Sequence, residues 1–207
     1  TASLLPSDVE LVDLGIHRLR DLKAPQRVYQ VGDDRFPPLR SVDAVPTNLP
    51  VLVTELIGRH DDRDRIVALL QNERLVTLTG VGGIGKTRLA LAVAASIAPS
   101  FPDGCWFAEL APASNDDEVV RAVGAAMGVT TADRAGLCRY VADRQVLIVL
   151  DNCEHILADA ARLAESLLGA GPDVAVIVTS REPLGIPGEV VRGVPSLATP
   201  TDDASAA

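Results

Sequence analysis

The chain has 207 residues, of which 47% are hydrophobic, 23% charged and 3% aromatic, so it can bury a core made mainly of aliphatic side chains. Its net charge of −9 argues against nucleic-acid binding by this segment alone, because binding phosphates requires clustered Lys and Arg. No apolar run approaches the roughly 20 residues that span a bilayer. Residues 1–6 lack the basic and apolar regions of an export signal. We therefore expect a cytoplasmic protein with reduced thiols, and Thr1 in place of Met indicates a segment of a longer chain.

The residue pattern divides the chain into four parts. Residues 1–36 contain two short strand-like runs, 9–12 and 27–31, and form a short β-rich tail. Residues 37–54 are punctuated by prolines and are predicted to be a linker, because proline restricts its own φ and extends the residue before it. Residues 55–198 are predicted to be the main domain, and residues 199–207 a tail.

The main domain alternates between helical and strand-like patterns. In chain order we predict a helix over 61–72, a strand over 75–79, a helix over 87–98, a strand over 105–110, helices over 116–127 and 137–143, a strand over 146–150, a helix over 156–168 and strands over 174–178 and 189–194. The runs at 146–150 and 174–178 are continuously apolar, which is typical of strands covered on both faces. This alternation predicts an α/β fold in which helices flank a parallel sheet.

A glycine-rich loop follows the strand predicted over 75–79. Its sequence, Gly80-Val81-Gly82-Gly83-Ile84-Gly85-Lys86-Thr87, satisfies the phosphate-binding pattern G-x-x-x-x-G-K-[ST]. Glycines let backbone N–H groups converge on phosphate oxygens, and the following helix directs its positive end at them. Lys86 would reach the β- and γ-phosphates and Thr87 would coordinate Mg²⁺. We predict that these residues and the adjacent Arg88 bind a nucleotide, which makes the chain a P-loop NTPase.

A carboxylate ends the apolar strand predicted over 146–150. Asp151 is predicted to hold Mg²⁺ together with Thr87; the alternative is that it caps the next helix. Glu154 would polarise a water molecule, or else complement the positive N-terminus of that helix. Cys153 and His155 lack the further ligands that a zinc site requires.

The third signal is Thr179-Ser180-Arg181, which follows the strand predicted over 174–178. Because ligands of open α/β sheets bind outside the carboxyl ends of the strands, Arg181 is a candidate sensor of the γ-phosphate. The alternative is an arginine with a surface role only. The chain has no guanine-recognition motif and no signature of transporter-type ATPases, so both of those classes are disfavoured.

Several motifs resemble a known family in order and spacing. Residues 48–198 resemble the STAND-class, NB-ARC-like signalling ATPases of bacterial LuxR-type transcriptional regulators. The matching motifs are Asn48-Leu49-Pro50, Leu56-Ile57-Gly58-Arg59, Arg74-Leu75-Val76-Thr77-Leu78-Thr79-Gly80 with the loop, Phe101-Pro102-Asp103-Gly104, Leu150-Asp151-Asn152-Cys153-Glu154-His155, Thr179-Ser180-Arg181-Glu182-Pro183-Leu184-Gly185 and Gly188-Glu189. Residues 8–32 resemble the C-terminal end of a class III nucleotide cyclase domain.

The resemblance implies an ATP/ADP switch within a longer chain that has winged-helix and output domains and can self-associate on binding ATP. It also implies that Ile57, Gly58 and Arg59 pack near the adenine and ribose. The family has Glu directly after the Gly-Arg pair and again two residues later, where this chain has His60 and Asp62. The cyclase catalytic residues are absent, so we expect no synthesis of cyclic nucleotides.

Three functions are compatible with these observations. The first is a switch that binds ATP or ADP and hydrolyses ATP slowly with Mg²⁺. The second is a P-loop kinase or metabolic ATPase acting on a small substrate. The third is a scaffold that binds no nucleotide. In each case we expect no membrane partner and no direct DNA binding by this segment.

Overall fold

The computed structural model describes residues 11–17, 26–32, 45–50, 58–129 and 133–195. The chain divides into two compact units, residues 1–45 and 46–207, and the division falls within the predicted linker. The boundaries of the four predicted parts otherwise stay a prediction. No helix in the described ranges is both long and apolar enough to cross a membrane.

The first unit contains an antiparallel pair of strands, β1 (Leu11–His17) and β2 (Gln26–Val31). The register pairs Leu11 with Val31 and shifts between Asp13 and Gly15. β2 agrees with the predicted run 27–31. β1 extends to residue 17, five residues beyond the prediction, and residues 9 and 10 lie outside the described ranges.

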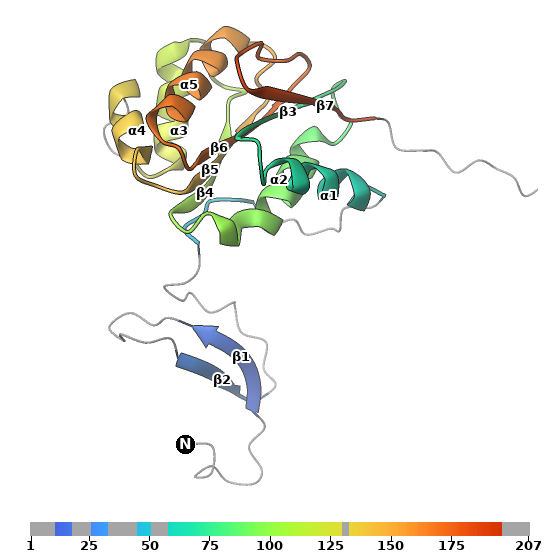
Figure 1. The fold of residues 1–207 in the computed structure, drawn as a ribbon, viewed down its shortest axis with the longest axis vertical. Coiled ribbons are helices and arrows are strands. Elements are labelled where there is room, and N and C mark those ends of the chain that lie inside the picture. The colour runs from blue at the N-terminus through green and yellow to red at the C-terminus, as the bar shows by residue number, and fades with distance from the viewer. Residues whose placement is uncertain (1–10, 18–25, 33–44, 51–57, 130–132, 196–207) are drawn as a thin grey trace, which may run out of the picture. The chain divides into compact units, whose positions relative to one another are not determined.

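The second unit is built on a five-stranded sheet in the order β4-β5-β6-β3-β7, and all neighbouring pairs are parallel (Figure 1). The strands are β3 (Leu75–Thr79), β4 (Gly104–Glu109), β5 (Val146–Asp151), β6 (Val174–Ser180) and β7 (Glu189–Gly193). Every residue of β5 and β6 is buried, as expected for strands covered on both faces. β6 also continues two residues beyond its predicted end, so Thr179 and Ser180 belong to the strand.

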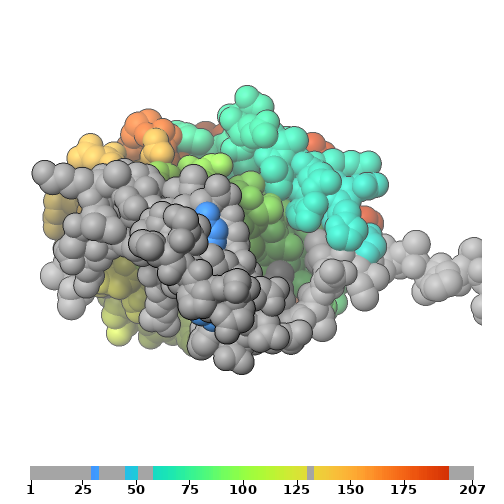
Figure 2. Space-filling model, turned by 90° about the horizontal axis from the view of Figure 1, so that it is seen from below, coloured from blue at the N-terminus to red at the C-terminus, as the bar shows by residue number. Residues whose placement is uncertain are grey.

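Helices cover both faces of this sheet. They are α1 (His60–Leu69), α2 (Lys86–Ile97), α3 (Asp116–Ala126), α4 (Arg134–Val141) and α5 (Leu157–Ala170), and a short 3-10 helix, Ala98–Ser100, follows α2. In Figure 1, α1 and α2 lie on one face and α3, α4 and α5 on the other. Ile66 is the buried residue of α1, and the space-filling view shows this helix, in turquoise, at the surface (Figure 2). The predicted α/β fold, a parallel sheet flanked by helices, is confirmed.

Two side-chain caps explain where α3 and α4 begin. Asn115 Oδ1 accepts a hydrogen bond from the Glu118 amide at 3.1 Å, and Asp133 Oδ1 accepts one from the Gly136 amide at 2.6 Å. Such caps satisfy amides that have no partner within the helix. Because Asp133 supplies the second cap, α4 begins at Arg134, three residues before the predicted start.

The main core lies between the sheet and the face formed by α3, α4 and α5. The predicted inner face of α3 is buried, as is that of α5; the residues are Val119, Val120, Val123, Met127, Ile156, Ala160, Leu163, Ala164 and Leu167. They pack against alternate residues of β5 and β6, among them Ile148, Leu150, Val176 and Val178. This core holds the carboxyl ends of the central strands in fixed positions.

The described part of the predicted linker lies along the outer edge of β4. The Cys105 amide donates to the Pro46 carbonyl at 2.9 Å, and Thr47 Oγ1 donates to the Cys105 carbonyl at 2.7 Å. The Asn48 carboxamide pairs with both backbone groups of Phe107: Nδ2 donates to the carbonyl at 2.8 Å, and Oδ1 accepts from the amide at 2.7 Å. One side chain thus replaces the peptide group of a neighbouring strand.

We expect Asn48→Ala to lower the free energy of unfolding by about 1 kcal/mol, because two partly solvated hydrogen bonds to Phe107 are lost. Urea unfolding followed by circular dichroism measures this change. Asn72→Ala, at an exposed position after α1, is the matched control and should shift stability by less than about 0.5 kcal/mol. Equal stability of the two variants would contradict the pairing.

Candidate functional site

Three strands of the sheet bring the predicted site residues together at the carboxyl end of the sheet. β3 leads into the loop at Gly80, β5 ends at Asp151, and β6 ends at Ser180, just before Arg181. β6 lies between β3 and β5, and all three run in the same direction. Their carboxyl ends therefore meet, which is where ligands bind in open α/β sheets.

The loop has a backbone conformation that depends on glycine. Gly80, Gly83 and Gly85 have φ values of 150°, 76° and 95°. Other residues rarely adopt these angles. A Cβ at Gly80 would also lie 3.1 Å from the Val194 carbonyl oxygen, so the loop begins in close contact with the chain that follows β7.

Lys86 is the first residue of α2, and its ammonium group turns back over the loop. Nζ donates to the carbonyl of Gly80 at 2.8 Å and to that of Val81 at 3.1 Å, and the residue is 8% exposed. An ammonium group has three N–H donors, so two carbonyl contacts still permit a third bond to an anion. The positive end of α2 acts at the same place.

Asp151 joins the loop to the neighbouring strands. Its Oδ1 accepts hydrogen bonds from Thr87 Oγ1 at 2.7 Å and from Thr179 Oγ1 at 2.5 Å, and the residue is 6% exposed. A carboxylate beside a hydroxyl is a pair of hard oxygen ligands of the kind that Mg²⁺ takes. The carboxylate thus faces Thr87 and Thr179, whereas α5 begins at Leu157, and the residue before it, Ile156, makes no side-chain cap.

Sequence reasoning missed the part that Thr179 plays. Its hydroxyl donates to Asp151 and also accepts a hydrogen bond from the Asn152 amide at 3.0 Å. Asn152 has a φ of 63°, which is uncommon for a residue other than glycine. The available signal was a threonine directly after the continuous apolar run 174–178, at the end where ligands bind.

We expect Thr179→Val to lower the free energy of unfolding by about 2 kcal/mol. Valine keeps the shape of the side chain, but the Asn152 amide and the Asp151 carboxylate each lose a hydrogen-bond partner. Thermal unfolding monitored by calorimetry measures the loss. Thr179→Ser keeps the hydroxyl and serves as the control. If the serine and valine variants melt alike, the hydroxyl has no such role.

Glu154 and Arg181 also meet at this end of the sheet. Arg181 Nε lies 3.3 Å from Glu154 Oε1, and the Arg181 side chain is 65% exposed. When the side-chain carboxamide of Asn152 is oriented so that both its oxygen and its nitrogen have hydrogen-bond partners, Nδ2 donates to Glu154 Oε1 at 3.1 Å. A Cβ on Gly82 would lie 3.5 Å from Arg181 Nη2, so the guanidinium adjoins the glycine loop. The roles predicted for Glu154 and Arg181 stay predictions.

The predicted adenine-side residues are described only in part. Ile57 lies outside the described ranges, and Gly58 is exposed with a φ of 71°. Arg59 is 4% exposed, and its Nη2 donates to the carbonyls of Ile84 at 2.9 Å and Pro195 at 2.7 Å. Arg88 lies in the first turn of α2 and is partly exposed.

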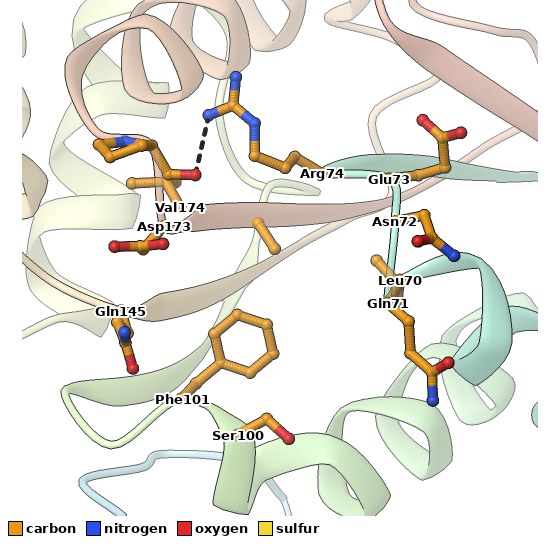
Figure 3. Close-up of a pocket in the computed structure, with 12 residues that line it drawn as sticks. Leu70, Gln71, Asn72, Glu73, Arg74, Ser100, Phe101, Gln145, Asp173 and Val174 are labelled. Carbon is orange, nitrogen blue, oxygen red and sulfur yellow. Dashed lines mark hydrogen bonds between the residues drawn. The ribbon is translucent and has the colours of Figure 1, made fainter.

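A separate pocket of about 230 Å³ lies at the opposite end of the sheet (Figure 3). It is lined by residues 70–74, before β3, and by Ser100, Phe101, Gln145 and residues 172–175. Arg74 at its rim donates to the carbonyls of Leu168 and Gly171, both at 2.9 Å, and so caps the end of α5. This pocket adjoins the amino ends of β3 and β6 and is not part of the glycine-loop site.

The three cysteines differ in burial. Cys105 and Cys153 are buried and Cys138 is partly exposed. Burial raises the pKa of Cys105 to about 12 and also raises that of Cys153, with the charges of Asp151 and Glu154 adding to the second shift. Burial raises the pKa of Cys138 as well.

We expect iodoacetamide at pH 8 to alkylate Cys138 first in the native protein. The thiolate is the reacting form, and a thiol with a pKa near 12 holds only about one part in ten thousand of it at that pH. Mass spectrometry of timed samples should show Cys105 and Cys153 reacting at least about a hundredfold faster in urea. Rapid native labelling of Cys153 would contradict its burial.

Comparison with known proteins gives relatives that are much longer than this chain. The "Putative HTH-type transcriptional regulator Rv0890c" of Mycobacterium tuberculosis H37Rv is 44% identical over 143 residues, covering 66% of this chain and 16% of that protein. "Uncharacterized protein Rv0894" of the same strain is 37% identical over 156 residues, or 72% of this chain and 39% of that protein. The regulatory protein AfsR of Streptomyces griseus is 32% identical over 179 residues, or 78% of this chain and 18% of that protein. No protein-family model matches the chain.

Solved structures give similarities at low sequence identity. The STAND protein PH0952 of Pyrococcus horikoshii, which has a tetratricopeptide repeat sensor, has a TM-score of 0.49 and 16% identity, covering 76% of this chain and 25% of that one. Cdc6p of Pyrobaculum aerophilum has a TM-score of 0.48 and 16% identity, covering 72% of this chain and 48% of that one.

Proposed function

We propose that the chain is an ATP/ADP-binding switch domain of a multidomain, LuxR-type STAND transcriptional regulator, with slow Mg²⁺-dependent ATP hydrolysis. The observation that carries the proposal is the convergence of a glycine loop, Lys86 and the Thr87–Asp151 pair at one end of the sheet. Loop amides and Lys86 would hold the phosphates, and Thr87 and Asp151 would hold Mg²⁺. Arg181 would contact the γ-phosphate, and Glu154 would orient the attacking water.

The regulatory part of the proposal draws on the relatives. One is named as an HTH-type transcriptional regulator and another as the regulatory protein AfsR. Winged-helix and output domains elsewhere in the longer protein would read the nucleotide state, and ATP would favour self-association. On this proposal the protein works in the cytoplasm. The resemblance of residues 8–32 to a cyclase domain adds no activity.

We expect Lys86→Ala to weaken Mg-ATP binding about tenfold or more, because a charge-assisted contact to phosphate is worth roughly 1.5–3 kcal/mol. Isothermal titration calorimetry measures the dissociation constant. Arg121→Ala on α3 also removes one positive charge, lies away from the loop, and should leave the constant unchanged. An unchanged constant for Lys86→Ala would refute the phosphate role.

We expect wild-type hydrolysis well below one turnover per second, against about 10 per second for a median enzyme. The residue after Asp151 is Asn152, whose neutral amide cannot take a proton from water. Glu154, two positions further on, makes contacts with Arg181 and Asn152 that compete with a water molecule for its carboxylate oxygens. Phosphate release measures the rate, and tens of turnovers per second would rule out a slow switch.

The same assay separates the remaining alternatives. A large further decrease in Glu154→Gln would assign the water-orienting role to Glu154, and an unchanged rate would leave it as a helix-terminus residue. Phosphate transfer to small acceptors would favour a kinase. A melting temperature that does not rise with ADP or ATP would favour a scaffold that binds no nucleotide.

A further inference from the structure

Arg59 connects two segments that are far apart in the sequence. It lies directly before α1 and is 4% exposed, and its Nη2 donates to the Ile84 carbonyl at 2.9 Å and the Pro195 carbonyl at 2.7 Å. Nη1 donates to Asp62 Oδ2 at 3.3 Å. A single guanidinium group therefore holds the glycine loop, the start of α1 and the chain that leaves β7.

The two carbonyl partners are also linked through the sheet. The Val194 amide donates to the Thr79 carbonyl at 2.7 Å, directly before the loop. A Cβ on Gly80 would lie 3.1 Å from the Val194 carbonyl oxygen. The departing chain thus touches the first residue of the loop, while Arg59 holds its fifth residue, Ile84.

Peptide planarity gives the Ile84 contact a direction. In a trans peptide the C=O of Ile84 and the N–H of Gly85 point to opposite sides. When Arg59 holds the Ile84 carbonyl, it turns the Gly85 N–H away from itself, and in a phosphate-binding loop such amides bind the phosphate oxygens. Arg59 Nη2 is buried and donates to both the Ile84 and the Pro195 carbonyls, and losing either hydrogen bond is costly. We therefore expect the loop and residue 195 to move together.

We propose that Arg59 is a positioning residue that couples the phosphate-binding loop to the segment after β7, at Pro195. The inference rests on the proposed function, since nucleotide exchange supplies the movement of the loop. Arg59 acts through backbone carbonyls, so the phosphates alone are enough to drive the coupling. Inorganic pyrophosphate with Mg²⁺ should therefore act in the same way as Mg-ADP.

The test measures amide exchange at Val194 by NMR in the 207-residue chain. In the wild type, saturating Mg-ADP or Mg-pyrophosphate should slow Val194 exchange about tenfold. In Arg59→Lys, which keeps the charge but not the planar fork, the slowing should fall below about twofold at ligand saturation. Arg59→Met removes every donor and should behave in the same way. Arg63→Ala, in the first turn of α1, should retain the wild-type response.

Each variant is measured at saturating ligand, as checked by calorimetry, so that a lost Val194 response reflects lost coupling and not weaker ligand binding. A full Val194 response in Arg59→Lys at saturation overturns the coupling and leaves the proposed function intact. A wild-type response to ADP but not to pyrophosphate also overturns it, because contact with the base would then be responsible. If the wild type binds neither ligand, the proposed function fails together with the coupling.

Discussion

One carboxylate oxygen holds together the carboxyl end of this sheet, where the candidate site lies. Asp151 Oδ1 accepts hydrogen bonds from the hydroxyls of Thr87, in α2, and Thr179, in β6, so one helix and two neighbouring strands of the sheet meet at a single atom. The carboxylate is nearly buried, and two donors offset the cost of removing its charge from water. The position of α2, and therefore of the loop before it, depends on this contact. The hydrogen bond between Thr87 and Asp151 would have to rearrange when Mg²⁺ binds, because the Thr87 hydroxyl and the Asp151 carboxylate are both candidate ligands.

Much of this architecture could be predicted from local patterns. The strand 75–79 was predicted with its observed bounds, and the inner faces of α3 and α5 follow from apolar spacing, because one helical face must be buried. The glycine loop was recognisable because few residue types can adopt its conformation. The start of α4 was missed, since the cap at Asp133 outweighs the hydrophobic pattern.

The remaining features depend on contacts between residues distant in the sequence. Asn48 and Phe107 are 59 positions apart, and Arg59 and Pro195 are 136 apart. Nothing in the local pattern around Asn48 or Arg59 indicates a backbone partner so far along the chain. Thr179 is uncharged and follows an apolar run, so its place in the sequence does not show that it bonds to both Asp151 and Asn152. The chemistry of the site was therefore easier to predict than the contacts that hold it in place.

The two edges of the sheet differ in how they can meet another chain. On the β4 side, Pro46, Thr47 and Asn48 occupy the outward-facing backbone groups of Cys105 and Phe107. On the β7 side, the described strand pairs with β3, and Val191 is 41% exposed. Open strand edges are the usual starting point for uncontrolled growth of β-structure, and continuous growth needs a free edge at both ends. With the β4 edge occupied, pairing of this sheet with another copy through β7 would stop at two copies.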